Sequence, residues 1–480
     1  MIRLPLIIVL LSTLLTSCSQ FLPRKKPQES LPQRSGWRHA PSWAHTALQQ
    51  DWWKDFADSR LDSLIDTAFS RNPDLGILSK RLERSRAQTQ QARAAAWPAI
   101  NLNSRFLPGR EQSFATGWSP IDLKPWANDG SVSWEIDLFG RIAAGTRAAQ
   151  EAEQAALWDL HAGRLLTATA VAGAHFRILR LNEEHALVAS SVSANQKILT
   201  FLRARKEAGL VSETVILRQE AEHERLTRSL LDLERLRGLA LLQLETLCGG
   251  ESISLPAGHL STCRTPPLPG RTSAAVLAQR PDMLASEARL RSAFELEESK
   301  RLNLLPSLAL GGSARARGPS LLSDFRQWMA QVGPSLDIPI YSPSRIASVA
   351  AGRAATNEAA ALYRKRAITA FKEVESSYLN LGNRHNQLQA AKREVVALEK
   401  ARRNTLATFE NGLVSQIELL ESERRSLEGK RQELAIRHAL LRDHLTLIRA
   451  LGGEARTRIP ENRSSKIWFD FAKILCKSKS

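Results

Sequence analysis

The chain has 480 residues, of which 43% are hydrophobic and 24% charged, with a formal net charge of +18 and a pI of about 10.2. Such a balance raises nucleic acid as a partner, but basic and acidic residues alternate along helix-forming stretches, as in Glu220, Glu222, Glu224, Arg225 and Arg228, so we interpret them as a solvated helix surface and expect no nucleic acid. The four cysteines form no C-x-x-C pair and no Cys/His cluster, which excludes a recognisable zinc site or disulfide framework and leaves open whether Cys248 and Cys263 pair.

The first residues are typical of a bacterial lipoprotein. An arginine precedes an apolar stretch, residues 4–15, that is too short to span a bilayer, and Leu15-Thr16-Ser17-Cys18 closes it like a lipobox. We therefore predict a signal peptide over residues 1–17, export, and a covalent lipid on Cys18 that anchors the mature chain to a membrane. An ordinary secretory signal with an incidental cysteine is the alternative. Ser19 after the cysteine resembles sorting to the outer membrane.

Landmarks of the chain recur in two halves. Asn72-Pro73-Asp74 returns as Arg280-Pro281-Asp282, and Gly249-Gly250 returns as Gly452-Gly453. A repeat of this length is a duplicated structural half and not a solenoid unit. The predicted organisation is as follows: a lipidated linker at 18–50, a first repeat at 51–255, an inter-repeat linker at 256–279, a second repeat at 280–453, and a basic tail at 454–480 for which we expect disorder.

Long helices are predicted where proline is missing, between Pro125 and Pro256 and between Pro343 and Pro460. A helix over residues 140–207 would be roughly 100 Å long and needs neighbours along its whole length. Leucine or isoleucine recurs every seven residues in the last helix, at Leu413, Leu420, Leu427, Leu434, Leu441 and Ile448. The companion coiled-coil position is mixed, with Ile417, Arg424, Arg431, His438 and Leu445. This half-seam favours a helix in a cylinder with one wet face.

Between the helices the hydrophobic period is two, which predicts two β-strands in each half. The alternating hydrophobic residues are Ile100, Leu102 and Phe106; Val132, Trp134, Ile136 and Leu138; Leu308 and Leu310; and Val332, Leu336, Ile338 and Ile340. Runs of about ten residues suit tilted membrane strands, and five tryptophans lie on or beside them, as an interfacial girdle requires: Trp97, Trp118, Trp126, Trp134 and Trp328. A soluble antiparallel sheet is the alternative.

Four strands do not close a barrel, and an open sheet edge is not tolerated in lipid. The chain is therefore expected to oligomerise, each copy lending four strands to a shared wall. A cylinder with a water-filled lumen argues against two copies, because the interior of an eight-stranded barrel is filled by side chains. The pattern alone does not choose between three and four copies.

Four motifs carry a family resemblance over nearly the whole mature chain: Trp52-Trp53-Lys54-Asp55-Phe56, Asn72-Pro73-Asp74-Leu75, Trp134-Glu135-Ile136-Asp137-Leu138-Phe139-Gly140-Arg141 and Arg280-Pro281-Asp282. Together they resemble the outer membrane factor family, the TolC-like efflux lipoproteins, in the branch that partners resistance-nodulation-division pumps. The resemblance implies an α+β membrane protein: a homotrimer with a twelve-stranded β-barrel in the outer membrane, continued by a long α-helical tunnel in the periplasm. One departure is Tyr341-Ser342-Pro343, where the second strand-to-helix turn lacks the glycine of the first.

The function implied by the resemblance is the outer membrane duct of a tripartite efflux system. Its partners would be a periplasmic adaptor and an inner-membrane pump, and its cargo small toxic molecules. An exported coiled-coil scaffold, a porin-like passive channel and the duct of a type I protein secretion system are the alternatives. We predict no enzyme, because the ten histidines have no paired carboxylate, phosphate loop or nucleophile elbow beside them. No metal and no cofactor other than the Cys18 lipid are expected.

Two places in the helices are candidate functional sites. Gly209-Leu210-Val211-Ser212 and Gly412-Leu413-Val414-Ser415 suit turns between a long helix and its return helix, since glycine accepts φ > 0 and serine can cap the next helix. We predict that these tips meet the adaptor; a plain helix hairpin is the alternative. Glu421 and Arg424 resemble the acid and arginine of the family's periplasmic gate, and a simple ion pair between them on one helix is the other interpretation. The matching positions of the first half are Arg218 and Ala221.

Overall fold

The structure is a computed structural model that describes residues 37–40, 51–106, 112–113, 117–118, 126–264, 266, 274–318, 321 and 327–453. These residues divide into two compact units. Unit 1 contains Pro73–Gly163 and Asp282–Phe371, and unit 2 contains Arg164–Pro281 together with residues 37–72 and 372–453. Each unit therefore combines parts of both predicted repeats.

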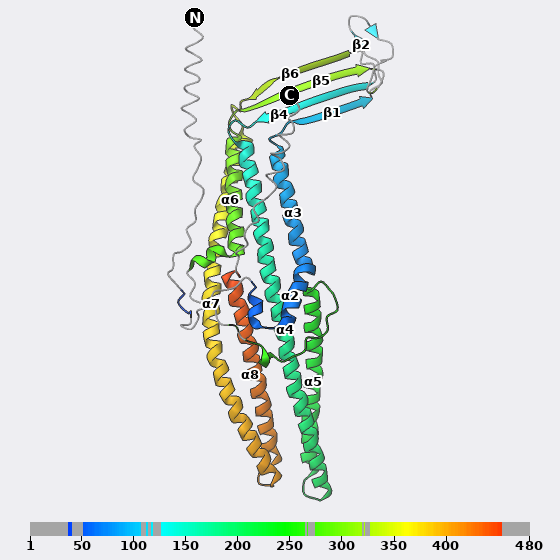
Figure 1. Cartoon of the computed structure of the whole chain (residues 1–480), viewed down its shortest axis with the longest axis vertical. Helices are drawn as coiled ribbons and strands as arrows, with labels where there is room; N and C mark the ends of the chain where they lie inside the picture. Colours follow the sequence, from blue (N-terminus) through cyan, green and yellow to red (C-terminus); the bar gives the residue numbers. More distant parts are fainter. Residues whose placement is uncertain are drawn as a thin grey trace, which may run out of the picture. The chain divides into compact units, whose positions relative to one another are not determined.

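The order of elements repeats between the two halves (Figure 1). The first half contains the 3₁₀ helix η2 (Trp52–Phe56), α2 (Ser59–Arg71), α3 (Pro73–Ala94), β1 (Ala99–Phe106), β2 (Gln112–Ser113), β3 (Gly117–Trp118), β4 (Trp126–Ile136), α4 (Arg141–Glu207) and α5 (Glu213–Leu247). The second half contains η4 (Ala274–Gln279), α6 (Pro281–Leu302), β5 (Ser307–Gly318), β6 (Gln327–Asp337), α7 (Pro343–Glu410) and α8 (Gln416–Leu451), with η3 (Leu260–Thr262) between the halves. The predicted long helices and the four predicted strands are thus present.

Unit 1 contains a four-stranded antiparallel sheet in the order β1-β4-β5-β6. The central pair, β4 and β5, joins the two halves, with Trp126 aligned to Gly318 and Ile136 aligned to Leu308. The outer strands β1 and β6 pair on one side only within the described residues. Gly140, at φ +82°, makes the turn from β4 into α4, and the Asp137 carboxylate accepts the N–H groups of Ile142 and Ala143 in the first turn of that helix.

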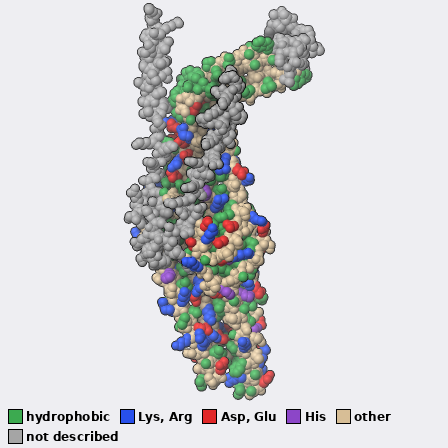
Figure 2. All heavy atoms as spheres, in the orientation of Figure 1, with side chains coloured by type: hydrophobic (Ala, Val, Ile, Leu, Met, Phe, Trp, Pro, Cys, Tyr) green, Lys and Arg blue, Asp and Glu red, His purple; other side chains and the backbone are tan. Residues whose placement is uncertain are grey.

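The two faces of this sheet differ in chemistry, because alternate residues of a strand point to opposite faces. One face carries exposed hydrophobic side chains: Ile100, Leu102, Phe106, Val132, Trp134, Leu310, Trp328, Val332 and Leu336. Apart from Met329, Ala99, Ala127 and Ala309, the other face carries polar side chains: Asn101, Asn103, Arg105, Asp129, Ser131, Ser133, Ser313, Arg315, Arg317 and Gln331. The predicted period-two pattern is therefore confirmed within the strands, whereas Leu138, Ile338 and Ile340 lie beyond the ends of β4 and β6. Figure 2 shows hydrophobic side chains on the side of the sheet turned to the viewer.

Unit 2 has a hydrophobic core built from η2, α2 and the parts of the long helices that belong to this unit. The ring of Trp52 packs edge-on against Trp53, and the ring centroids of Phe56 and Phe176 lie 5.0 Å apart. Cys248 is fully buried in this core and Cys263 packs at its margin. Both are free thiols, which answers the pairing question left open by the sequence.

Both halves close in the same way. The side-chain amide of Asn72 donates to the carbonyl of Leu247 at 2.8 Å, and the guanidinium of Arg280, the repeat counterpart of Asn72, donates to the carbonyl of Ala450 at 2.7 Å. The residue before each Pro-Asp motif thus binds the end of the return helix of its own half. This match in three dimensions supports the predicted duplication.

Gly249 should tolerate substitution less well than its neighbour Gly250. Both have positive φ, +92° and +84°, so an alanine strains either position by about 1–2 kcal/mol. A Cβ at Gly249 would also lie 2.7 Å from the carbonyl oxygen of Arg71, whereas a Cβ at Gly250 would meet nothing within 4 Å. We expect Gly249→Ala to lower the Tm clearly more than Gly250→Ala in a thermal unfolding series. Equal shifts would contradict the close approach of α2 to this turn.

Several sequence predictions lie outside the described residues: the signal peptide 1–17, Cys18, most of the linker 18–50 and the tail 454–480. The predicted linker 256–279 contains η3 and η4, and Leu260 and Leu277 within it are fully buried. No helix among the described residues is both long and apolar enough to cross a bilayer.

Candidate functional site

The two predicted tips are glycine-terminated helix ends of identical geometry. After α4, the N–H of Gly209 donates to the carbonyl of Lys206 at 2.8 Å and the N–H of Leu210 donates to that of Arg205 at 2.9 Å. After α7, Gly412 donates to Phe409 and Leu413 to Thr408, both at 2.9 Å. With φ of +74° and +77° at the glycines, both are Schellman motifs. The predicted turns are confirmed in both halves.

After each glycine an exposed leucine lies in the turn, and the return helices begin three residues later than the sequence predicted, at Glu213 and Gln416. Leu210 is 64% exposed and Leu413 is 76% exposed, so neither contributes to the core of the single chain. Ser415 caps α8 by accepting the N–H of Glu418 at 3.4 Å, whereas Ser212 makes no side-chain cap on α5. The predicted serine cap is therefore present in the second tip only.

A small core joins the two hairpins behind the tips. It combines one or two side chains from each of the helices α4, α5, α7 and α8: Leu199, Leu202, Ile216, Phe409 and Leu419. Beside it the buried Gln416 donates its amide N–H to the side-chain oxygen of Gln219 at 2.6 Å, which links α8 to α5. The four helix ends are thus packed together behind the tips.

Farther from the tips, the buried carboxylate of Glu222 is bound by two arginines. Glu222 on α5 is 4% exposed and accepts from Arg225 of its own helix at 2.5 and 2.9 Å. It also accepts from Arg424 of α8, at 3.0 Å from Nε and 2.5 Å from Nη2. Burial raises the pKa of Glu222, but the hydrogen bonds from both arginines outweigh it and hold this pKa below its ordinary value. The carboxylate is therefore charged at neutral pH.

A second pair of the same kind lies seven residues further along α8. Arg431 donates to the carboxylate of Glu184 on α4 at 2.7 and 2.8 Å, and Arg180 binds the other oxygen at 2.6 Å. Arg424 and Arg431 occupy the companion coiled-coil position that the sequence assigned to a wet face. Both keep part of the side chain in solvent, 47% for Arg424 and 31% for Arg431, which agrees with a wet face. Each also contacts a buried carboxylate and so links α8 to the first-half hairpin.

The structure separates the two predicted gate residues. Glu421 is exposed and accepts from Arg425, one turn on, at 2.7 Å, while Arg424 points to Glu222. The simple ion pair between Glu421 and Arg424 is therefore not formed. The interpretation of Glu222 as part of a solvated helix surface is also wrong, although its neighbour Glu220 fits that description, being exposed and paired with Arg203.

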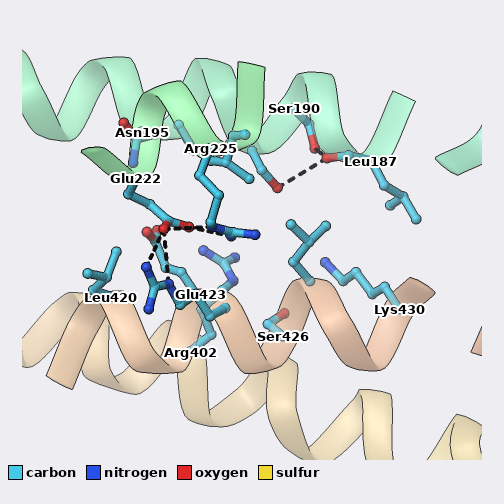
Figure 3. Close-up of a pocket in the computed structure, with 15 residues that line it drawn as sticks. Leu187, Ser190, Asn195, Glu222, Arg225, Arg402, Leu420, Glu423, Ser426 and Lys430 are labelled. Atoms are coloured by element: carbon cyan, nitrogen blue, oxygen red, sulfur yellow. Dashed lines mark hydrogen bonds and ion pairs between the residues drawn. The ribbon is translucent and has the colours of Figure 1, made fainter. Parts of the chain in front are cut away.

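A cavity of about 190 Å³ lies beside these ion pairs, between α4, α5, α7 and α8 (Figure 3). Arg402 of α7 and Lys430 of α8 line it, and both bind the carboxylate of Glu399, at 2.7 and 2.8 Å. The hydrogen bond from Arg402, followed by those from Lys430 and Ser426, lowers the pKa of Glu399 to about 2 against the effect of burial. Glu423 also lines the cavity, and burial raises its pKa.

The sequence did not single out these cross-helix partners. Glu222, Glu184 and Glu399 stand in stretches where charged residues are frequent, and composition alone does not tell a buried carboxylate from a solvated one. The available signal was the pair Arg424 and Arg431, which interrupt a hydrophobic companion position and so require partners when that face packs.

Comparisons with known proteins agree with the duplicated architecture. A family model described as outer membrane efflux protein matches residues 64–250 and again residues 273–453. The pyoverdine export outer membrane protein OpmQ of Pseudomonas aeruginosa is 25% identical over 429 residues, which cover 87% of this chain and 90% of that protein. The cation efflux system protein CusC of Escherichia coli K12 is 24% identical over 92% of this chain and 97% of that protein. The solved outer-membrane channel OprN matches with a TM-score of 0.80 at 21% identity, over 90% of this chain and 100% of that one.

Proposed function

Because the chain belongs to the outer membrane efflux protein family, we propose that three copies form its working channel, with a shared twelve-stranded barrel that continues as a helical tunnel into the periplasm. The protein is an outer membrane efflux channel and not an enzyme. The copy number, the closed barrel and the assembly partners belong to the proposal.

The sheet of unit 1 carries the barrel proposal. Its hydrophobic face has tryptophans towards both strand ends: Trp134 and Trp126 share one face of β4 eight residues apart, which is about 27 Å along a strand. This is the order of the apolar band, about 25 Å tall, that outer membrane barrels present between two aromatic girdles. The opposite, polar face suits a water-filled lumen.

The edges of the sheet favour closure by further copies. The four strands alternate in direction, so β6 of one copy and β1 of the next would run antiparallel and could pair without a change of topology. Closure gives hydrogen-bond partners to the backbone N–H and C=O groups of the edge strands, which lipid cannot supply. A copy number of three agrees with the family resemblance of the motifs, and a wide lumen disfavours two.

We further propose that the tips at Gly209 to Ser212 and Gly412 to Ser415 dock a periplasmic adaptor, which couples the channel to an inner-membrane pump of the resistance-nodulation-division type. The supporting observation is the repeat of one turn geometry with an exposed leucine after each glycine, Leu210 and Leu413. Two equivalent tips per chain would give a trimer a ring of six similar docking points.

The periplasmic gate is assigned to α8. Glu421 is exposed, so three copies would place a ring of carboxylates at a constriction. Arg424 acts one turn later by holding α8 to Glu222 of α5, and Arg431 repeats this hold at Glu184. Opening the tunnel would move one hairpin against the other and would break or rearrange these ion pairs.

We propose a small molecule as the cargo. The relatives do not indicate which one, because one is described by pyoverdine export and another by cation efflux. Among the described residues no group of three or more His, Cys, Asp or Glu side chains could hold a metal ion. A dedicated metal route is therefore not supported by a binding site in this part of the chain.

The function is tested with the purified full-length protein. We expect trimers after chemical cross-linking in detergent and discrete current steps in planar bilayers. We also expect the purified channel to capture the periplasmic adaptor of its efflux system. Monomers that carry no current but coat cells would favour the scaffold, and large constant currents without adaptor binding would favour a passive porin.

The lipid on Cys18 is proposed to serve sorting and assembly more than retention, since a barrel embedded in lipid is already held in the membrane. We expect Cys18→Ala, fused to a standard secretory signal, to yield some functional trimer in the outer membrane fraction. If this variant stays entirely in the periplasm as a monomer, the lipid is a structural requirement and the proposal is wrong.

A further inference from the structure

The polar face of the sheet concentrates its arginines at one end of the strands. Arg105 stands next to the end of β1, and Arg315 and Arg317 stand near the end of β5, so all three lie on the side of the loops that connect β1 to β4 and β5 to β6. The register aligns Asp129 with Arg315, and Ala127 with both Arg105 and Arg317. These four charged residues therefore share one face and two neighbouring rows.

The charges in these rows do not balance. Asp129 binds Arg105 at 3.1 Å and Arg315 at 3.2 Å, so one carboxylate serves two guanidinium groups. Arg317 has no acidic partner among the described residues and is exposed. The segments 107–125 and 319–326, which connect the strands, contain three acidic and three basic residues and add no net charge. Each chain thus has an excess of two positive charges at this end of the sheet.

Elsewhere on the described part of the polar face the charged side chains are paired. Towards the helices its rows contain small or neutral side chains: Ala99, Ser133, Gly311 and Gly333 in one row, and Asn101, Ser131, Ser313 and Gln331 in another. The two carboxylates at the helix end, Glu135 and Asp337, are bound by Arg141 at 2.7 Å and Arg345 at 3.0 Å. A solute crossing this face would meet strong charge only at the arginine rows.

We propose that Arg105, Arg315 and Arg317 form a selectivity ring at the outer end of the channel that favours anionic cargo, such as small molecules bearing carboxylate, phosphate or sulfate groups. The inference rests on the proposed function, because only a closed barrel turns the polar face into a lumen. Rings of arginine or lysine favour anions in pores, and a guanidinium offers planar paired donors that fit carboxylate and phosphate oxygens. Arg317, which shares no carboxylate, contributes most.

The test is the reversal potential of the purified full-length channel in a planar bilayer under a KCl gradient. We expect chloride to permeate better than potassium in the wild type. The double variant Arg315→Gln/Arg317→Gln should lower the chloride-to-potassium permeability ratio at least twofold, and Asp129→Asn should raise it. The matched control for the single variant Arg317→Gln is Lys80→Gln, which also removes one exposed positive charge, but from α3. Lys80→Gln should leave the permeability ratio unchanged.

Two results would overturn the inference, and they are distinguishable. Normal current steps with an unaltered permeability ratio in Arg315→Gln/Arg317→Gln would reject the ring and leave the channel in place. A wild-type protein without current would reject the proposed function and the ring with it. A twofold fall in the ratio with normal current steps would support both.

Discussion

Replacing Arg424 by alanine is expected to raise the open fraction of the resting channel about tenfold or more in planar bilayers. Arg424 holds α8 to the buried Glu222 of α5 through two hydrogen bonds. A hydrogen bond to a charged group contributes about 1.5–3 kcal/mol to stability. A difference of about 1.4 kcal/mol changes an equilibrium constant by a factor of ten. Glu222 stays paired with Arg225 in the variant, so the carboxylate is not left buried alone.

Arg425→Ala is the matched control for this prediction. Arg425 is the next residue of α8, and within the described residues its ion pair is with the exposed Glu421, a surface pair worth little. It should change the open fraction by less than twofold. Glu222→Gln should open the channel as Arg424→Ala does. The double variant should add little to either single variant, because both changes remove the same ion pair between Arg424 and Glu222. Additive effects, or equal opening by Arg425→Ala, would show that this ion pair does not hold the gate.

The elements with strong local signals were predictable from the sequence. A helix across residues 140–207 and strands with period two follow from side-chain periodicity, and the structure has α4 at Arg141–Glu207 and the strands in a continuous sheet. Gly209 and Gly412 were identifiable because a positive φ after a helix favours glycine, and both turned out to be Schellman turns.

The partners of the gate residues were not predictable, and the reason is physical. Glu220 and Glu222 are two residues apart and chemically identical, yet one is solvated and the other is 4% exposed. Which side of α5 is buried depends on how the hairpin packs against α8, and no local pattern in the single sequence states that. The same packing decides that Arg424 binds Glu222 and not Glu421, the nearer acid along the chain.

The tips should be the most sensitive place for transport. We expect the double variant Gly209→Arg/Gly412→Arg to abolish efflux, so that cells become as susceptible as a deletion strain, while cross-linked trimers remain. Both glycines have positive φ, +74° and +77°, where an arginine strains the turn by about 1–2 kcal/mol. Nothing lies within 4 Å of a Cβ at either position, so the fold itself can accept the side chains.

Two controls separate docking from folding in this experiment. Gly209→Asn/Gly412→Asn adds no charge and tolerates the left-handed conformation, so it should retain most transport. Gly238→Arg adds a charge to an exposed position of α5 with open space around it and should leave efflux unchanged. The adaptor should co-purify with the asparagine variant and not with the arginine variant. Because the two charges are added directly beside Leu210 and Leu413, unchanged drug export by the arginine variant would mean that the adaptor binds elsewhere on the protein.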